Sequence, residues 1–177
     1  MSTHRILGID PGTAAVGFGV VDKREGDSYR YITSGVISTP KTMSNPQRLA
    51  MIRADMITLL DEYKPDVVAV EAIFFFKNAK TLVPVSQARG VILESAATGG
   101  YDIAEYTPMQ VKLCLTGHGR ADKSFVQTAV AKLLNLSQII KPDDANDAIA
   151  IAVCHARMDV SSAVRAALRT NAEVQKQ

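Results

Sequence analysis

Short apolar runs separated by turn residues dominate the first forty positions of the chain. Two such runs cover residues 5–10 and 15–21, and Pro11-Gly12-Thr13 lies between them. A third run covers residues 31–38 and follows polar, glycine-containing residues at 25–28. Proline presets φ and glycine accepts positive φ, so these short links are typical of tight turns. The pattern therefore predicts three strands in an antiparallel meander.

After residue 44 the apolar positions change to helical spacing. Asn45 is the expected N-cap of a helix, and Pro46 its first helical residue. Apolar residues three or four positions apart then predict one helical face. They are Leu49, Ile52, Met56, Leu59 and Tyr63.

Strand and helix patterns alternate through the rest of the chain. The run at 67–72 is continuously apolar up to Glu71, which is typical of a central strand that is buried on both faces. We expect a helix at about 78–98, a strand at 101–106, short helices at 109–115 and 124–136, and a last helix that begins near Asp143 or Asp144. The order predicts an α/β fold in which a mixed five-stranded sheet, a three-strand antiparallel meander plus parallel strands, is flanked by helices on both faces.

Length and composition describe an ordinary globular protein. The chain has 177 residues, 47% hydrophobic and 21% charged. We expect a single domain over residues 1–160 and a surface helix or flexible tail at 161–177. No apolar run reaches the roughly 20 residues of a membrane helix, and the N-terminus lacks the pattern of a signal peptide, so we expect a cytoplasmic protein without a membrane partner. A net charge of only +2 means that any DNA-binding charge must be concentrated locally.

Four carboxylates stand out against this background. Asp10 and Glu71 each follow an apolar strand pattern, and right-handed crossovers would make those two strands parallel. Ligand sites in such sheets lie beyond the carboxyl ends of the strands. Asp144 and Asp147 are three positions apart, so they share one face of the last helix. Small residues beside them would let that helix pack closely on the sheet.

Carboxylates that converge repel one another, and their pKa values rise unless cations compensate the charge. Oxygen ligands of this kind suit Mg²⁺ or Mn²⁺. Two such ions roughly 4 Å apart form a known arrangement for in-line displacement at a phosphodiester. The alternative is purely structural, because a strand-end acid often accepts turn hydrogen bonds and Asp143 or Asp144 could cap its helix. The combination of two strand-end acids with a helical pair favours the metal site.

Several motifs in order make the sequence resemble the RuvC family of Holliday-junction resolvases. They span about residues 5–157 and are GIDPGT, VAVEAIFFFKNAKT, QARG, YTPMQVK, GHGRADKSFV and DDANDAIAIAVCHA. The resemblance implies a ribonuclease H-like fold and a homodimeric, metal-dependent endonuclease. Such an enzyme nicks two opposing strands of a four-way DNA junction in recombination and repair, together with a branch-migration helicase.

Carried over by motif, the resemblance implies an acidic tetrad of Asp10, Glu71, Asp144 and Asp147. The D-A-N-D spacing favours Asp144 over Asp143 as the first acid of the helical pair. Some members of the family have histidine at the position of Asp144. Lys112 and Lys123 match basic positions near the family's active site, where a lysine could stabilise the transition state electrostatically.

Residues next to this site are candidates for holding DNA. Three of the five phenylalanines follow Glu71 directly, and we expect Phe74 or Phe75 to wedge between or stack on bases and Phe76 to be in the core. Phosphate contacts would come from a basic surface, whose clustering is inferred from the fold. The remaining DNA-binding candidates are Lys77, Asn78, Lys80, Arg89, His118 and Arg120. We expect His155 to be a core histidine.

Other functions share parts of this pattern. GIDPGT alone also fits the phosphate-gripping lobe of an actin-like ATPase or sugar kinase, but that architecture needs two lobes and this chain supplies one. A related ribonuclease H-like RNA-processing nuclease is a second alternative, and a non-catalytic junction-binding module is a third. The aromatic run and the Gly-His-Gly-Arg loop favour branched DNA, and the complete tetrad favours catalysis.

The helix expected within residues 81–97 has one apolar face for the sheet. Its other face is our candidate for the contact between two copies of the chain, since twofold dimers are the commonest oligomers.

Overall fold

The structure is a computed structural model that describes residues 3–73 and 79–158. Residues 1–2, 74–78 and 159–177 lie outside this description, as do the side chains of residues 79–81. Each predicted element within the described part is present and in the predicted order. The strands are β1 (His4–Asp10), β2 (Ala15–Lys23), β3 (Tyr29–Ser38), β4 (Val67–Glu71) and β5 (Asp102–Tyr106). The helices are α1 (Asn45–Tyr63), α2 (Ala79–Thr98), α3 (Pro108–Thr116), α4 (Lys123–Leu133) and α5 (Asp143–Met158).

The strands form one mixed sheet in the order β3-β2-β1-β4-β5. β1, β2 and β3 are the predicted antiparallel meander, and β4 runs parallel to both β1 and β5. The helical crossovers α1 and α2 make that parallel pairing possible, because parallel neighbours need a long connection. As a result β1 and β4 lie side by side at the centre, and both end at the same edge.

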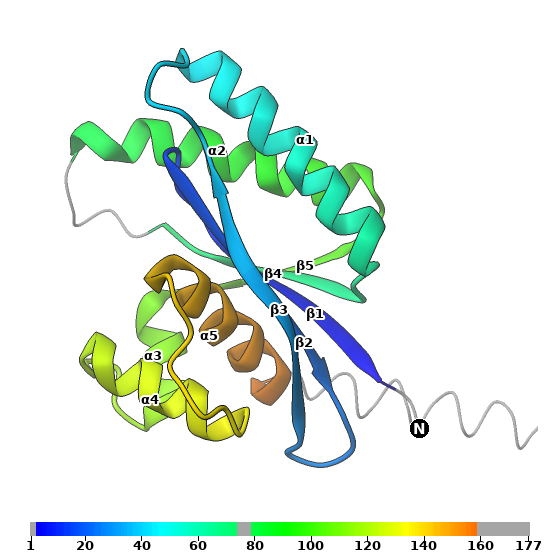
Figure 1. The fold of residues 1–177 in the computed structure, drawn as a ribbon, viewed down its shortest axis with the longest axis vertical. Coiled ribbons are helices and arrows are strands. Elements are labelled where there is room, and N and C mark those ends of the chain that lie inside the picture. The colour runs from blue at the N-terminus through cyan, green and yellow to red at the C-terminus, as the bar shows by residue number, and fades with distance from the viewer. Residues whose placement is uncertain (1–2, 74–78, 159–177) are drawn as a thin grey trace, which may run out of the picture.

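Helices cover both faces of the sheet, as predicted (Figure 1). α1 and α2 lie on one face, and α3, α4 and α5 lie on the other. Side chains alternate along each central strand. In β1, Leu7 and Ile9 join the core under α1 and α2, whereas Ile6 joins the core under α5. The fold therefore has two apolar cores separated by the sheet.

The first turn of α1 corrects one detail of the sequence analysis. Ser44, and not Asn45, is the N-cap, and Pro46 is accordingly the second helical residue. The Ser44 backbone N–H donates to the side-chain oxygen of Gln47 at 2.9 Å, which is half of a capping box. The pairing of Ser44 with Gln47 outweighs the simple preference for asparagine as the N-cap before proline.

His155 is 7% exposed, which confirms that it belongs to the core. Tyr106 Oη lies 2.8 Å from its Nδ1. Among the helices of the described residues, none has the length and apolar character needed to cross a membrane. The predicted division into a domain at 1–160 and a tail at 161–177 stays a prediction, since the tail lies outside the described residues, and so does the cytoplasmic location.

Candidate active site

Asp10 and Glu71 are the last residues of adjacent parallel strands. β1 and β4 are aligned so that Ile9 pairs with Val70, which places Asp10 next to Glu71. By strand alternation Asp10 shares a face with Ile6, and Glu71 shares a face with Ala69. Both of those apolar residues belong to the core under α5. The two carboxylates therefore lie on the side of the sheet that α5 covers.

Glycines in β1 and β2 allow the backbone of α5 to approach this part of the sheet. Gly8 and Gly19 pair directly, and Gly17 pairs with Asp10. A Cβ at Gly8 would lie 2.1 Å from the carbonyl oxygen of Ala148, and one at Gly17 would lie 2.0 Å from that of Asp144. Side chains at these positions would push the helix away. Because these strand positions carry no side chain, the first turns of α5 can lie over the end of β1.

The carboxylates are close enough to perturb one another. Burial, followed by repulsion from Glu71, Asp147 and Asp144, raises the pKa of Asp10 to about 8. Burial and repulsion from Asp147 raise the pKa of Glu71 to about 7, although a hydrogen bond with Asp10 opposes this shift. Both groups therefore resist carrying full negative charge at neutral pH, and a nearby cation would relieve the repulsion.

A small cavity of about 180 Å³ opens beside these acids. Its lining combines charged residues from β4, α3, α4 and α5 with apolar residues of the same three helices. The charged members are Glu71, Lys112, Lys123 and Asp147. Lys123 Nζ lies 2.8 Å from Asp147 Oδ2 and 3.5 Å from Asp143 Oδ2. The structure thus places both predicted lysines at the predicted acidic site.

The donor set fits a hard divalent cation, because carboxylate oxygens are its preferred ligands and the charge at Asp10 is poorly compensated. The site is nevertheless not a ready-made cage. Among residues 3–73 and 79–158, no three histidine, cysteine or acidic side chains already have an arrangement that could hold one metal ion. Instead, the ammonium group of Lys123 donates a hydrogen bond to the carboxylate of Asp147. Binding of a cation therefore requires these side chains to turn.

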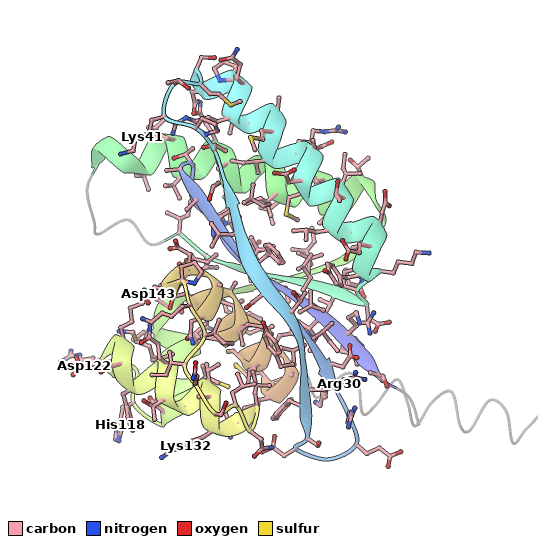
Figure 2. All side chains as sticks on the ribbon, in the orientation of Figure 1. Arg30, Lys41, His118, Asp122, Lys132 and Asp143 are labelled. Atoms are coloured by element: carbon pink, nitrogen blue, oxygen red, sulfur yellow. The ribbon has the colours of Figure 1, made fainter. Side chains whose placement is uncertain are left out.

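Asp143 lies apart from the acids around Asp10. It accepts hydrogen bonds from Gln127 at 3.1 Å and from Lys141 at 2.8 Å. The groups that raise the pKa of Asp10 include Asp144 and not Asp143. Figure 2 shows Asp143 beside the first turn of α5. This placement supports the choice of Asp144 for the tetrad, which stays a proposal.

The predicted DNA contacts are only partly within the described residues. Phe74, Phe75, Phe76, Lys77 and Asn78 lie outside them, and for Lys80 only the backbone, in the first turn of α2, is described. Their roles stay predictions.

Three further DNA candidates are described. Arg89 forms an ion pair with Glu105 of β5, and its Nε donates to the carbonyl oxygen of Glu71 at 3.2 Å. Its side chain is 19% exposed, so it ties α2 to the strand ends beneath the site. His118 and Arg120 are exposed on the loop that joins α3 to α4, and Figure 2 shows His118 at the outside of that layer. Phosphate contacts by these three residues stay predictions.

The sequence analysis missed the residues that position the acids. Gly8, Gly17 and Gly19 interrupt two otherwise strong strands, and an isolated glycine in a strand is a recognised sign of close backbone approach. That signal was available in the sequence. The partnership of Asp143 with Gln127 had no local signal, because sixteen residues separate the two.

Solved structures with this architecture define the class of the protein. Thermus thermophilus RuvC is 35% identical, with a TM-score of 0.80, and the match covers 86% of this chain and 93% of that chain. T. thermophilus RuvC in complex with Holliday junction substrate is 34% identical, with a TM-score of 0.82, over 87% and 93% of the two chains. The yeast mitochondrial resolvase Ydc2, at 18% identity and a TM-score of 0.64, shares the fold alone. The chain has the ribonuclease H-like fold of these nucleases.

Sequence comparison narrows this class to one family. The model for crossover junction endodeoxyribonuclease RuvC matches residues 6–155. A protein of that name from Syntrophomonas wolfei is 50% identical over 85% of this chain and 87% of its own length. Another, from Halothermothrix orenii, is also 50% identical, over 85% and 90%. The chain therefore belongs to the RuvC family of crossover junction endodeoxyribonucleases. This confirms the resemblance and the nuclease class, and it disfavours the kinase-like and RNA-processing alternatives.

Proposed function

We propose that this protein resolves Holliday junctions by paired, symmetric nicks in two opposing strands. The single observation that carries this proposal is the convergence of Asp10 and Glu71, at adjacent strand ends, with Asp144 and Asp147 of α5. Membership of the family supplies the reaction class, and the Thermus relative was solved with a Holliday junction. Recombination and DNA repair are the processes that such a reaction would serve.

Asp10, Glu71, Asp144 and Asp147 would hold the metal, which we propose to be two ions of Mg²⁺ or Mn²⁺. Bound there, the ions supply Lewis-acid chemistry for phosphodiester hydrolysis. Asp10 is half-buried at the end of β1, and its position next to Glu71 brings the two carboxylates together at one strand edge. Repulsion among the acids favours a cation over an empty site.

Lys112 and Lys123 line the same cavity as Glu71 and Asp147 and supply positive charge there. A phosphate that enters between the acids and these lysines would be held by the ammonium groups, and the charge that develops on its oxygens would be stabilised. Phe74 and Phe75 follow Glu71 in the sequence, so we propose that they contact unpaired or unstacked bases beside the cut. The remaining basic candidates would bind flanking phosphates.

Paired nicks need two active sites, so we propose a homodimer whose contact includes the outer face of α2. A branch-migration helicase is the proposed partner that moves the junction.

One experiment separates the proposed activity from its rivals. The protein is incubated with a synthetic four-way junction, a linear duplex and an RNA hairpin, each with Mg²⁺ or Mn²⁺. We expect symmetric nicks in the junction alone. Asp10→Asn should bind the junction without nicking it. Cleavage of the hairpin would favour RNA processing, and normal nicking by Asp10→Asn would overturn the assignment of the site.

A further inference from the structure

Asp143 is an acidic residue at the edge of the site that the proposed tetrad does not use. Its Oδ1 accepts hydrogen bonds from Gln127 Nε2 at 3.1 Å and from Lys141 Nζ at 2.8 Å. Its Oδ2 lies 3.5 Å from Lys123 Nζ. Gln127 is buried, with 7% of its surface exposed, so it is a firm anchor from α4. Because two donors hold one oxygen, the other oxygen is oriented toward Lys123.

Lys123 is shared between two acids that are one helical turn apart on α5. Its Nζ lies 2.8 Å from Asp147 Oδ2 and 3.5 Å from Asp143 Oδ2. Asp147 therefore has two roles that compete, since it pairs with Lys123 in this structure and is proposed to hold a cation. A cation bound at Asp147 would repel the ammonium group, because like charges at short range are costly in a partly buried site.

We propose that Asp143 is a positioning residue that retains Lys123 beside the reacting phosphate when Asp147 engages a cation. This inference rests on the proposed function. Lysine is a point charge on a flexible four-carbon stem, so without a fixed acceptor its ammonium group samples many positions. Asp143 offers that acceptor from the element that carries Asp144 and Asp147. Asp143 thus acts through Lys123 and touches neither metal nor DNA.

The competing possibility is that Asp143 is itself a metal ligand. Its geometry argues against this role, because Oδ1 is occupied by Gln127 and Lys141 and Oδ2 faces an ammonium group. If Asp143 were a metal ligand, its carboxylate would instead be expected to repel the neighbouring acidic side chains. If Asp143 is a positioning residue, the effect of substituting it depends on Lys123. If Asp143 is a metal ligand, that effect does not depend on Lys123.

A double-mutant cycle tests this dependence. Single-turnover nicking of a four-way junction at saturating protein and Mg²⁺ is measured for the wild type, Asp143→Asn, Lys123→Met and the double variant. We expect Asp143→Asn to slow nicking by about tenfold or more, because small misplacements of a charged group are costly. Junction affinity should change by less than about twofold, since the defect lies in the reacting state. The double variant should be no slower than Lys123→Met.

Asp122→Asn is the matched control. Asp122 is exposed, precedes Lys123 directly and makes no side-chain cap hydrogen bond, so its substitution removes one nearby charge without touching the pair. It should nick at the wild-type rate. Thermal unfolding verifies that each variant is folded, and Asp143→Ser replaces Asp143→Asn in the cycle if the latter does not fold.

Two results would overturn the inference. One is an Asp143→Asn defect of equal size with and without Lys123, and the other is a rise in the Mg²⁺ concentration needed for half-maximal nicking, as expected for a lost ligand. A wild-type protein that nicks no junction would refute the proposed function itself, which is a distinct outcome.

Discussion

At the scale of single residues, Asp10 is the member of the candidate site whose charge is most strongly opposed by its surroundings. It ends a buried strand, and burial together with three neighbouring carboxylates raises its pKa to about 8. A carboxylate whose pKa is higher in the folded state than in the unfolded state weakens folding as pH rises between the two values. In the absence of divalent cations, the free energy of unfolding should therefore fall from about pH 4 to about pH 8.

Asp10→Asn removes this effect. In EDTA at pH 8, we expect the variant to be more stable than the wild type by on the order of 1–3 kcal/mol, because no charge has to be buried. Urea unfolding at pH 5 and pH 8 measures the difference, which should be smaller at pH 5. Asp61→Asn, at an exposed position of α1, is the control: it keeps Asp10, so its stability should differ from that of the wild type by the same small amount at pH 5 and at pH 8. Equal stability of Asp10→Asn and wild type at pH 8 would contradict the predicted burial cost.

Divalent cations should reverse the order of stability and make the wild type more stable than Asp10→Asn. A ligand that binds only the folded state stabilises it by RT ln(1 + [L]/Kd), so the stabilisation rises with ligand concentration. Adding Mg²⁺ or Mn²⁺ should raise the melting temperature of the wild type, and it should raise that of Asp10→Asn much less. Differential scanning fluorimetry at pH 7.5 with a cation titration provides the measurement. The same rise in both proteins would place the cation elsewhere.

At the scale of helices and strands, the close approach of α5 to β1 and β2 brings the acids of α5 near Asp10. Gly8, Gly17 and Gly19 leave room for the helix backbone, and the helix contributes small residues such as Ala148 at the contact. Strands with larger side chains here would keep α5 away from the sheet. The acids of α5 would then lie too far from Asp10 to share a cation with it.

Gly17→Ala tests this packing. The added Cβ would lie 2.0 Å from the carbonyl oxygen of Asp144, so backbone must move. We expect the free energy of unfolding to fall by about 3 kcal/mol, as for a severe overpacking substitution, and nicking to fall with it. Gly90→Ala is the control, because its methyl group would meet nothing within 4 Å; it should be neutral or stabilising by up to about 1 kcal/mol. Similar effects of the two substitutions would contradict the role of close packing.

At the scale of the whole molecule, the sheet separates the helical layer beside the candidate site from the helical layer that we propose for the contact between two chains. α3, α4 and α5 carry the site residues on one face, and α1 and α2 cover the other (Figure 1). α2 buries Ala88, Ile92 and Ala96 and leaves Val83 61% exposed. A second chain at the outer face of α2 would cover Val83 and leave both active sites accessible.

Val83→Glu tests the assembly. The wild type should sediment at twice the 19.1 kDa mass of the chain, and the variant as a monomer, because a charge buried in an apolar contact is costly. Analytical ultracentrifugation at micromolar concentration measures the mass. The monomer should nick single strands of the junction without pairing the cuts. A monomeric wild type that still makes paired nicks would contradict the proposed dimer.

Local patterns in the sequence were sufficient to predict the strands and helices and the kinds of chemistry that the candidate residues could perform. The apolar runs and turns in residues 5–38, the helical spacing after Asn45 and the acids after two apolar runs depend on neighbours within a few positions. They can therefore be recognised without a fold. The cap of α1 was displaced by one residue because Ser44 and Gln47 pair across the first turn. The tertiary structure alone decided which groups meet. Asp10 and Glu71 became neighbours through the pairing of β1 with β4, and Lys123 reached Asp147 and Asp143 through the packing of α4 on α5. Burial and repulsion then raised the pKa values of Asp10 and Glu71. These effects act between residues that are distant along the chain, and for that reason no local pattern in the sequence contains them.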